Sequence, residues 1–349
     1  MPLNKHARRL DAIQARKVHP DQPKPAGKAM DSTRIASAEC MLSKGEQVPD
    51  PQRKWAGNVS SNAPTNECVY ETPVCILIPM PYDVSPRDNL GTMEYALFRL
   101  SKKNLRANEL IHYQLPDGYI KVSSGVHGMA TIWDYDIVLM AISHLNEAMN
   151  QCRAGKGEKP GRLFCPSLED IFKFCKRGGG GSQKEKLLGA LIRLSTTHVL
   201  IQRNQGIATH TNGESLISFF NIVNDSQTHN VEHVEIEIAN WMYEEITKGQ
   251  KPEVLTVHPD YFRISQGVGR FVYRLARKSA GKDMAVWGFD TLYQRSGSTG
   301  TLKEFSRLLR KTIRTKCLPE YDLAEEEGKM GSMLRIVHRA QVGKWSMKT

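Results

Sequence analysis

The sequence has 349 residues, of which 40% are hydrophobic, and this is enough to build the cores of two domains. Its 48 Lys and Arg outnumber 37 Asp and Glu, and the formal net charge of +11 favours an anionic partner: nucleic acid first, an acidic membrane surface second. The longest apolar run, VCILIPM near Val74, is too short to span a bilayer, and the basic N-terminus lacks the apolar region of a secretory signal.

The seven cysteines argue against two classes of small, stapled protein. Their number is odd and no Cys-x-x-Cys occurs, which disfavours both a disulfide framework and a cysteine-rich zinc site. We therefore expect reduced, mostly packed thiols and a cytoplasmic protein that is not held in a membrane.

Residues 1–72 are rich in Pro, Ser, Asn, Lys and Arg and have weak hydrophobic periodicity. This composition predicts a disordered basic arm, either a plain tail or a segment that touches DNA loosely. The short basic stretch 341–349 is expected to be a loose tail.

The first predicted domain, 73–228, begins with a strand-like region from Val74 to Gly125. This region includes EYALFRLSKK and IHYQLPDGYIKVSS, in which PDG is a turn between two β-rich flanks. An amphipathic helix is expected from Asp134 to Gln151. A second helix follows Ser167, a good N-cap, and runs to about Lys176.

After the glycines, a third helix is predicted over Gln183–Ser195, and two strand-like segments, TTHVLIQR and GESLISFFNIVNDS, follow it. NQGIATHTNG separates these two segments. The order of three helices and then a hairpin is typical of a winged helix-turn-helix.

The second predicted domain, 229–340, repeats this order without obvious sequence identity. It starts with the strand VEHVEIEIA and a short helix, NWMYEEITKG. Helices are expected at Tyr261–Ala280, over DMAVWGFDTLYQRSG and at Thr301–Lys316, and two strands, LPEYDLAEEEG and SMLRIVHRA, follow. The fold class predicted from these elements is α+β, with two tandem winged helix-turn-helix modules behind the arm.

The stretch RGGGGSQKEK raises the question of a phosphate-binding loop, but no window fits G-x-x-x-x-G-K-[ST]. We interpret it as the flexible turn of a helix-turn-helix; a plain inter-helix loop is the alternative. The helix after it is expected to bury Leu187, Leu188, Leu191 and Leu194. Its other face carries the candidate DNA contacts Ser182, Lys184, Lys186 and Arg193, of which Ser182 is also a cap.

The helix predicted over Thr301–Lys316 is the strongest candidate for a DNA reader. Leu302, Phe305, Leu308, Leu309 and Ile313 fall on one side of a helical wheel, and cations fall on the other (Lys303, Arg307, Arg310, Lys311, Arg314). Such a face repels itself unless a polyanion lies against it; a solvated face is the alternative. The arginines are suited to guanine edges in a major groove and the two lysines to phosphates.

Charge is concentrated around this helix. Between Asp260 and Lys316 thirteen Lys and Arg stand against four acidic residues, so this stretch holds most of the excess positive charge of the chain. A positive surface of this kind holds DNA through counterion release.

Enzyme signatures are missing. The histidines do not form the pattern of a rolling-circle nuclease, and no G-x-S-x-G, H-E-x-x-H or Rossmann fingerprint occurs. We therefore expect a binding protein rather than an enzyme, with no cofactor and no metal.

Three segments resemble the replication initiator protein A family of bacterial plasmids: HGMATIWDYDIVLMAISHL, LLGALIRLSTTHV and TLKEFSRLLRKTIRTKCLPEYDL. The resemblance covers roughly Val74 to Arg339 and includes EYALFRLSKK. It implies two winged-helix modules that bind repeated sites in double-stranded plasmid origin DNA and open the duplex locally. It also implies recruitment of the host replication initiator and replicative helicase, a homodimer as one state of the protein, and neither ATPase nor nuclease activity.

In one place the chain departs from the family, whose members tend to carry an aromatic residue just after the glycines; here Gln183–Lys186 follows. This leaves open whether the first module reads bases or mainly supports a dimer. Two other functions remain alternatives: a transcriptional regulator on the same scaffold, and a nuclease or relaxase.

Overall fold

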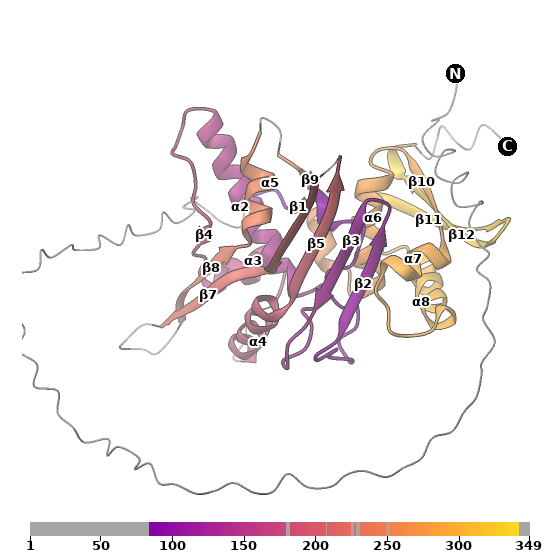
Figure 1. The fold of residues 1–349 in the computed structure, drawn as a ribbon, viewed down its shortest axis with the longest axis horizontal. Coiled ribbons are helices and arrows are strands. Elements are labelled where there is room, and N and C mark those ends of the chain that lie inside the picture. The colour runs from indigo at the N-terminus through magenta and orange to yellow at the C-terminus, as the bar shows by residue number, and fades with distance from the viewer. Residues whose placement is uncertain are drawn as a thin grey trace, which may run out of the picture. The chain divides into compact units, whose positions relative to one another are not determined.

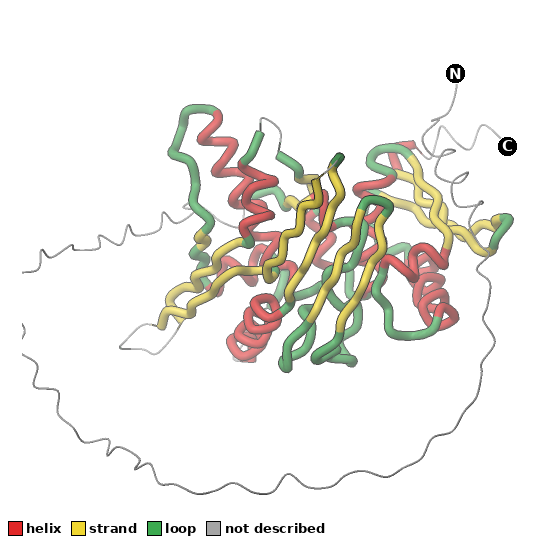
Figure 2. Tube along the Cα trace, in the orientation of Figure 1, coloured by secondary structure: helices red, strands yellow, loops and turns green. Residues whose placement is uncertain are grey.

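The computed structural model describes residues 84–178, 182–206, 208–224, 227, 231–249 and 252–341. All of them belong to one compact unit, Val69–Thr349. The arm expected over residues 1–72, the run VCILIPM and the tail after Gln341 lie outside the described residues. Figure 2 shows both helices and strands along the described chain, and the strands that pair in its sheets are antiparallel, which is typical of an α+β protein.

A four-stranded antiparallel sheet holds the predicted PDG hairpin. Its strand order is β2-β3-β5-β6, with bounds β2 Leu110–Leu115, β3 Gly118–Ser123, β5 His198–Gln205 and β6 Ala208–Ser215. The hairpin is confirmed, because Leu115 pairs with Gly118 across the turn. EYALFRLSKK, expected as a strand, is instead irregular, with one isolated bridge between Arg99 and Thr131.

The first half of the chain continues with three helices and a three-stranded sheet. The helices are α2 Tyr135–Arg153, α3 Leu168–Phe174 and α4 Ser182–Thr196. Ser167 caps α3 as predicted: its hydroxyl accepts from the Asp170 backbone N–H, and the Asp170 carboxylate accepts from the Ser167 N–H. The sheet order is β4-β8-β7, with β4 Leu163–Phe164, β7 Ile217–Asn224 and β8 Val231–Ile238.

The second half has a similar succession of elements, without strands that correspond to β5 and β6. Its helices are α6 Gly267–Ser279, α7 Phe289–Arg295 and α8 Leu302–Thr315. Its sheet order is β10-β12-β11, with β10 Met284–Gly288, β11 Tyr321–Gly328 and β12 Gly331–His338. In each half a helix, a strand, two helices and then two strands follow one another, with β5 and β6 inserted between α4 and β7 of the first half. In each three-stranded sheet the last strand lies between the other two.

Short elements complete the fold. β1 Arg87–Asn89 pairs with β9 Val254–Thr256, and α5 Asn240–Thr247 follows β8. Within the described ranges, 3₁₀ turns occur at Leu90–Thr92, Pro259–Arg263 and Arg339–Gln341.

Several expected boundaries were wrong. ATHTNG, expected as a separator, forms most of β6, and MAVWG, expected as part of a helix, is strand β10 before α7. The helix expected over Tyr261–Ala280 is a 3₁₀ turn and then α6, with a break before Gly267. That break brings Gly267 against the Leu100 carbonyl, where a Cβ atom would lie 2.0 Å from the oxygen.

The boundary expected at residue 229 falls inside a hairpin. β8, expected to open the second domain, pairs with β7 of the first half over most of its length. TTHVLIQR, expected as one strand of the first wing, joins β3 in the other sheet instead. The strand that completes the first three-stranded sheet is therefore the one that the sequence assigned to the second domain.

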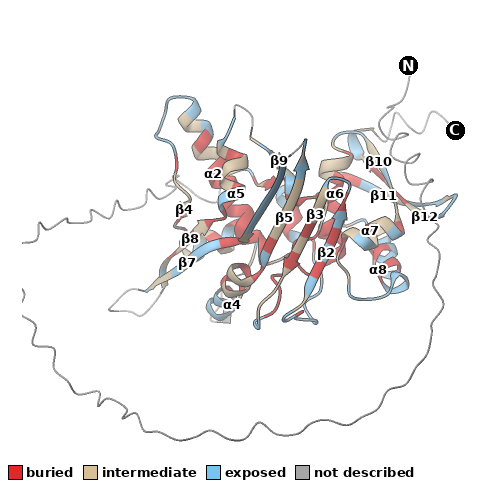
Figure 3. Ribbon diagram, viewed as in Figure 1, coloured by how far each residue is buried: buried red, intermediate tan, exposed pale blue. Residues whose placement is uncertain are grey.

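One continuous apolar core runs through both halves, and buried residues follow α2 and α6 in particular (Figure 3). Two buried ion pairs join the halves: Arg270 Nη1 lies 2.6 Å from Asp136 Oδ1, and Arg274 Nη2 lies 3.1 Å from Asp88 Oδ1.

Among the cysteines, Cys152, Cys175 and Cys317 are free thiols, whereas Cys165 is disulfide-bonded, contrary to expectation.

Candidate nucleic-acid interface

α8 forms where the sequence predicted it because its ends are capped and its apolar residues share one side. The Thr301 hydroxyl accepts from the Glu304 N–H at 3.2 Å, and Lys316, in the left-handed conformation at φ 45°, ends the helix. Phe305 and Leu309 are buried and anchor α8 to the core, although Leu302 is 42% exposed rather than packed.

The opposite side of α8 is exposed and cationic, as predicted. All five candidate contacts on it are exposed (Lys303, Arg307, Arg310, Lys311, Arg314). Four of them, all except Lys311, line most of a shallow groove of about 370 Å³, together with Thr301 and Glu304. A groove with this lining is suited to a negatively charged backbone rather than to an apolar ligand.

Two of the three arginines on this face are paired with carboxylates. Arg307 Nη2 lies 2.7 Å from Glu304 Oε1, one turn earlier on the same helix. Arg310 binds Glu325 of β11 through two nitrogens, with Nη2 2.7 Å from Oε1 and Nε 2.9 Å from Oε2. Hydrogen bonding raises the pKa of both guanidinium groups and lowers the pKa of both carboxyl groups, so each pair is fully ionised at neutral pH.

The basic face is therefore partly neutralised, and a clear positive excess remains. Within the part of the chain that the structure describes, Lys303, Lys311 and Arg314 have no carboxylate within salt-bridge distance. Exposed ion pairs contribute little to stability and exchange readily with phosphate, so pairing does not remove Arg307 or Arg310 from a DNA surface.

The arginines of α6 do not belong to that surface, which corrects the picture of one continuous positive patch from Asp260 to Lys316. Arg270 and Arg274 are 2% and 1% exposed and are neutralised by Asp136 and Asp88. Burial disfavours the charged form of both, but the neighbouring carboxylates outweigh it and raise their pKa values.

α4 has a similar amphipathic design, with one error in the predicted face. Leu187, Leu191 and Leu194 are buried as expected, while Leu188 is 41% exposed. Ala190, which the prediction did not include, fills the buried side instead.

The polar candidate residues on α4 differ in their exposure and in their hydrogen-bonding partners. Lys184 and Lys186 are exposed, and Lys184 Nζ donates to Asn224 Oδ1 at 3.4 Å. Arg193 is fixed by two nitrogens on the nearly buried Asp134, with Nε 2.8 Å from Oδ2. Ser182 is the first residue of α4, and its side chain lies outside the described part of the chain.

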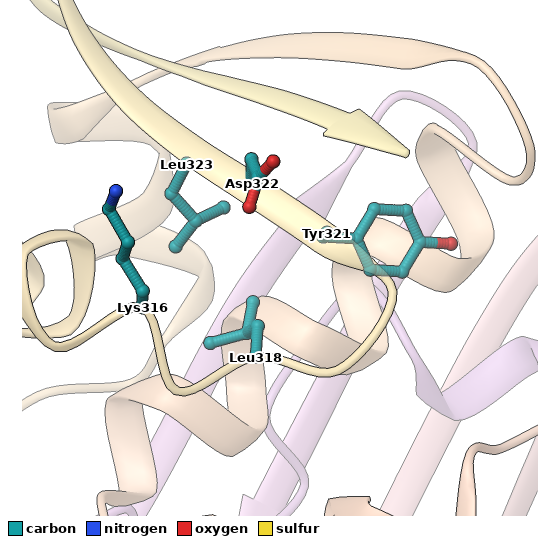
Figure 4. A pocket seen from close by; sticks show the side chains of 5 residues that line it. All are labelled: Lys316, Leu318, Tyr321, Asp322 and Leu323. Atoms are coloured by element: carbon teal, nitrogen blue, oxygen red, sulfur yellow. The ribbon is translucent and has the colours of Figure 1, made fainter. Parts of the chain in front are cut away.

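α4 and α8 lie along the same lower side of the view in Figure 1, with the loops at the lower ends of β2 and β3 between them. A small pocket of about 210 Å³ follows the C-terminal end of α8 (Figure 4). Lys316 and Asp322 stand there beside the leucines Leu318 and Leu323, and Tyr321 turns its hydroxyl away to donate to the Gly281 carbonyl at 2.6 Å. This lining brings no nucleophile together with a base.

The described residues contain no cluster of His, Cys, Asp and Glu that could hold a metal ion. No helix among them is both long and apolar enough to cross a membrane. The residue that sequence reasoning missed at this interface is Glu325, whose contact with Arg310 spans 15 positions and depends on the β11–β12 hairpin. The acidic run Glu325–Glu327 was the available signal.

A relative from Wigglesworthia glossinidia brevipalpis, named "Putative replication protein", is 29% identical over 245 residues, 68% of this chain and 84% of the relative. The crystal structure of domains 2 and 3 of RctB superposes with a TM-score of 0.50 at 9% identity, covering 71% of this chain and 98% of that one, so the two share a fold. The family model of replication initiator protein A matches residues 87–323. The chain belongs to the replication initiator protein A family.

Proposed function

We propose that the protein initiates plasmid replication by binding repeated sites in double-stranded origin DNA through two winged helix-turn-helix modules. The observation that carries this proposal is the exposed basic face of α8, on a helix that the core holds by its opposite side. Such an arrangement presents cations to a major groove without a rearrangement of the fold.

The assignment of two winged modules is supported by the repeated element order. Each half has three helices and a three-stranded sheet whose first strand, β4 or β10, lies between the first two helices and whose other two strands come after the third helix. The third helix, α4 or α8, stands where a recognition helix stands in a helix-turn-helix. On this reading the wings are the hairpins β7–β8 and β11–β12, and the first module ends after β8 instead of at residue 228.

Within the α8 module, Arg307, Arg310 and Arg314 are the proposed readers of guanine edges, and Lys303 and Lys311 the proposed phosphate contacts. The α4 module would use Lys184 and Lys186, with the N-terminus of α4 at Ser182 facing a phosphate. We leave Arg193 out of this set, because both of its hydrogen-bonding nitrogens face Asp134.

Two helices in successive major grooves would read a site of about 20 base pairs, since one turn of DNA holds about 10. Binding that bends or underwinds an adjacent A·T-rich segment would lower the free energy of strand opening. We further propose that the protein recruits the host initiator and replicative helicase, forms a homodimer in one of its states, and has no enzymatic activity of its own.

Gel-shift titration at fixed salt, with the DNA that flanks the coding region as the probe, tests the proposal. Lys311→Ala combined with Arg314→Ala should weaken specific binding and leave thermal unfolding unchanged, since both side chains are exposed. The matched control is Lys156→Ala combined with Lys282→Ala, two exposed lysines outside both proposed recognition helices. Equal affinity of the two double variants would rule out α8 as the reader.

Replication itself is tested by transformation. A plasmid that carries only the coding region and its flanking DNA should yield colonies in a host that cannot otherwise replicate it. A transcriptional regulator on the same scaffold would yield none. Incubation with supercoiled origin DNA and a divalent metal should produce no nicking, whereas a nuclease or relaxase would nick.

A further inference from the structure

We propose that two loops, Ser101–Glu109 and Ser124–Gly128, form a third DNA-contacting element that lies over the minor groove between α4 and α8. We name them the bridging loops. The inference rests on the proposed function and adds a contact surface outside both recognition helices.

The bridging loops connect the two proposed reading helices physically. On one side, Lys102 Nζ lies 4.4 Å from the ring centroid of Trp133, whose neighbour Asp134 holds Arg193 of α4. On the other side, Arg106 Nη1 donates to the Gly297 carbonyl at 2.5 Å, in the turn between α7 and α8. Figure 2 shows these loops at the lower ends of the β2–β3 hairpin, between α4 and α8.

The bridging loops are also fixed to each other and to the core. Buried Arg99 donates from Nη1 to the carbonyls of Ser101 and Asn104, at 2.7 and 2.8 Å. The Met129 N–H, just beyond the second loop, donates to the Leu105 carbonyl at 2.9 Å. Arg106 itself takes the left-handed conformation at φ 51°, which L-residues adopt only when their surroundings impose it.

The surface that these loops present is cationic with two apolar tips. Lys102 and Lys103 are exposed, and Leu105 and Val126 are 54% and 72% exposed. The one carboxylate of the loops, on Glu109, is occupied by Arg106 Nε at 2.8 Å. Proteins that bind the minor groove combine basic side chains, which hold the DNA backbone, with protruding apolar side chains, which press against base steps. These loops present the same combination.

DNA geometry identifies the occupant. If α4 and α8 lie in major grooves one turn apart on one face of the duplex, the groove that faces the protein between them is the minor groove. The bridging loops lie between the two helices, where that minor groove would be. Both their positive charge and their position therefore fit duplex DNA as the partner.

The first test is the salt dependence of binding to origin DNA. Each phosphate contact contributes about 0.9 to the slope of log K against log salt concentration. Lys102→Ala combined with Lys103→Ala should therefore reduce that slope by about 1.8. The control pair Lys156→Ala and Lys282→Ala should leave it unchanged. A loop variant with the slope of the wild type would overturn the proposal.

Hydroxyl-radical cleavage supplies a readout that is specific to the groove, because the radical attacks sugars accessible from the minor groove. The wild type should protect the sugars midway between the two major-groove contacts. Val126→Ser together with the two lysine substitutions should lose that protection and keep the thermal unfolding transition, since all three side chains are exposed. Protection that persists in this triple variant contradicts the loop contact.

The outcomes separate the two proposals. Loss of binding in the Lys311→Ala and Arg314→Ala variant, with an unchanged loop variant, overturns the bridging loops alone. Full binding in that α8 variant overturns α8 as the reader, whatever the loops do. A wild type that does not bind the repeats overturns both.

Discussion

Arg274 of α6 and Asp88 of β1 form a buried bidentate ion pair that ties the second half of the protein to the start of the first. Arg274 Nε lies 2.5 Å from Asp88 Oδ2, and the two side chains are 1% and 0% exposed. Arg274 Nη2 also donates to Thr92 Oγ1 at 2.7 Å, and its guanidinium carbon lies 4.7 Å from the Tyr135 ring centroid. The buried Arg274 charge cannot be left without a partner, so the spacing of the two proposed modules depends on this ion pair.

Asp88→Ala should lower the free energy of unfolding by about 3–5 kcal/mol, because it leaves the buried Arg274 charge without a partner. Urea denaturation followed by circular dichroism measures this. The control is Asp322→Ala, which breaks the exposed Arg339–Asp322 pair and should cost below about 1 kcal/mol. Similar costs for the two variants would contradict the assigned role of the buried pair.

Glu325→Gln should raise the affinity for non-specific DNA and lower the ratio of specific to non-specific affinity. The substitution removes a negative charge beside the proposed DNA surface, and it also releases the Arg310 guanidinium from a fixed orientation. Fluorescence anisotropy with origin and scrambled duplexes measures both affinities. Glu326→Gln is the control, since Glu326 pairs with Arg335 of β12 and not with α8. An unchanged ratio would mean that Glu325 does not position Arg310.

Glu245 predicts a pH dependence of stability with a defined sign. Burial raises the pKa of this carboxyl, so the folded state holds its proton to a higher pH than the unfolded state does. Its contribution to the unfolding free energy is greatest below the unfolded-state pKa and is lost as pH rises through the folded-state pKa. Glu245→Gln should therefore stabilise the protein at pH 7 and remove this loss.

The pKa of the neighbouring Glu244 is shifted in the opposite direction. Its pKa is lowered by hydrogen bonds from Lys248 and Asn240, so its contribution is present at neutral pH and is lost as pH falls through the folded-state pKa. Thermal unfolding between pH 4 and about 8, a range that brackets the carboxyl titration, compares the two glutamine variants. Shifts of the same sign in both variants would contradict these assignments.

Local patterns were sufficient for elements whose signals lie within one segment. The Ser167 cap of α3, the PDG hairpin and the wheel of α8 all rest on neighbours within a few positions, and the structure has each of them. Leu188 and Leu302 were assigned to buried faces by their angles alone, and both are about 40% exposed because no partner element covers them. Hydrophobic periodicity identifies the apolar side of a helix, but it does not show whether another element packs against that side.

Pairing between distant segments could not be predicted in this way. The residues of β8 alone predict a strand. That it pairs with β7 depends on the register across a hairpin, and the expected domain boundary separated the two strands. Arg270, Arg274 and Arg193 were counted as surface charge because their acidic partners stand 59 to 186 positions away. Arg310 and Glu325 likewise meet only once the β11–β12 hairpin has formed.

The proposed function depends most on α8 entering a major groove of origin DNA, and guanine N7 methylation by dimethyl sulfate tests this directly, since N7 lies in that groove. The wild type should protect guanines in two clusters about 10 base pairs apart, one for each recognition helix. Arg307→Ala combined with Arg310→Ala should lose one cluster and keep the other. Two intact clusters in that variant, or none in the wild type, would contradict the account.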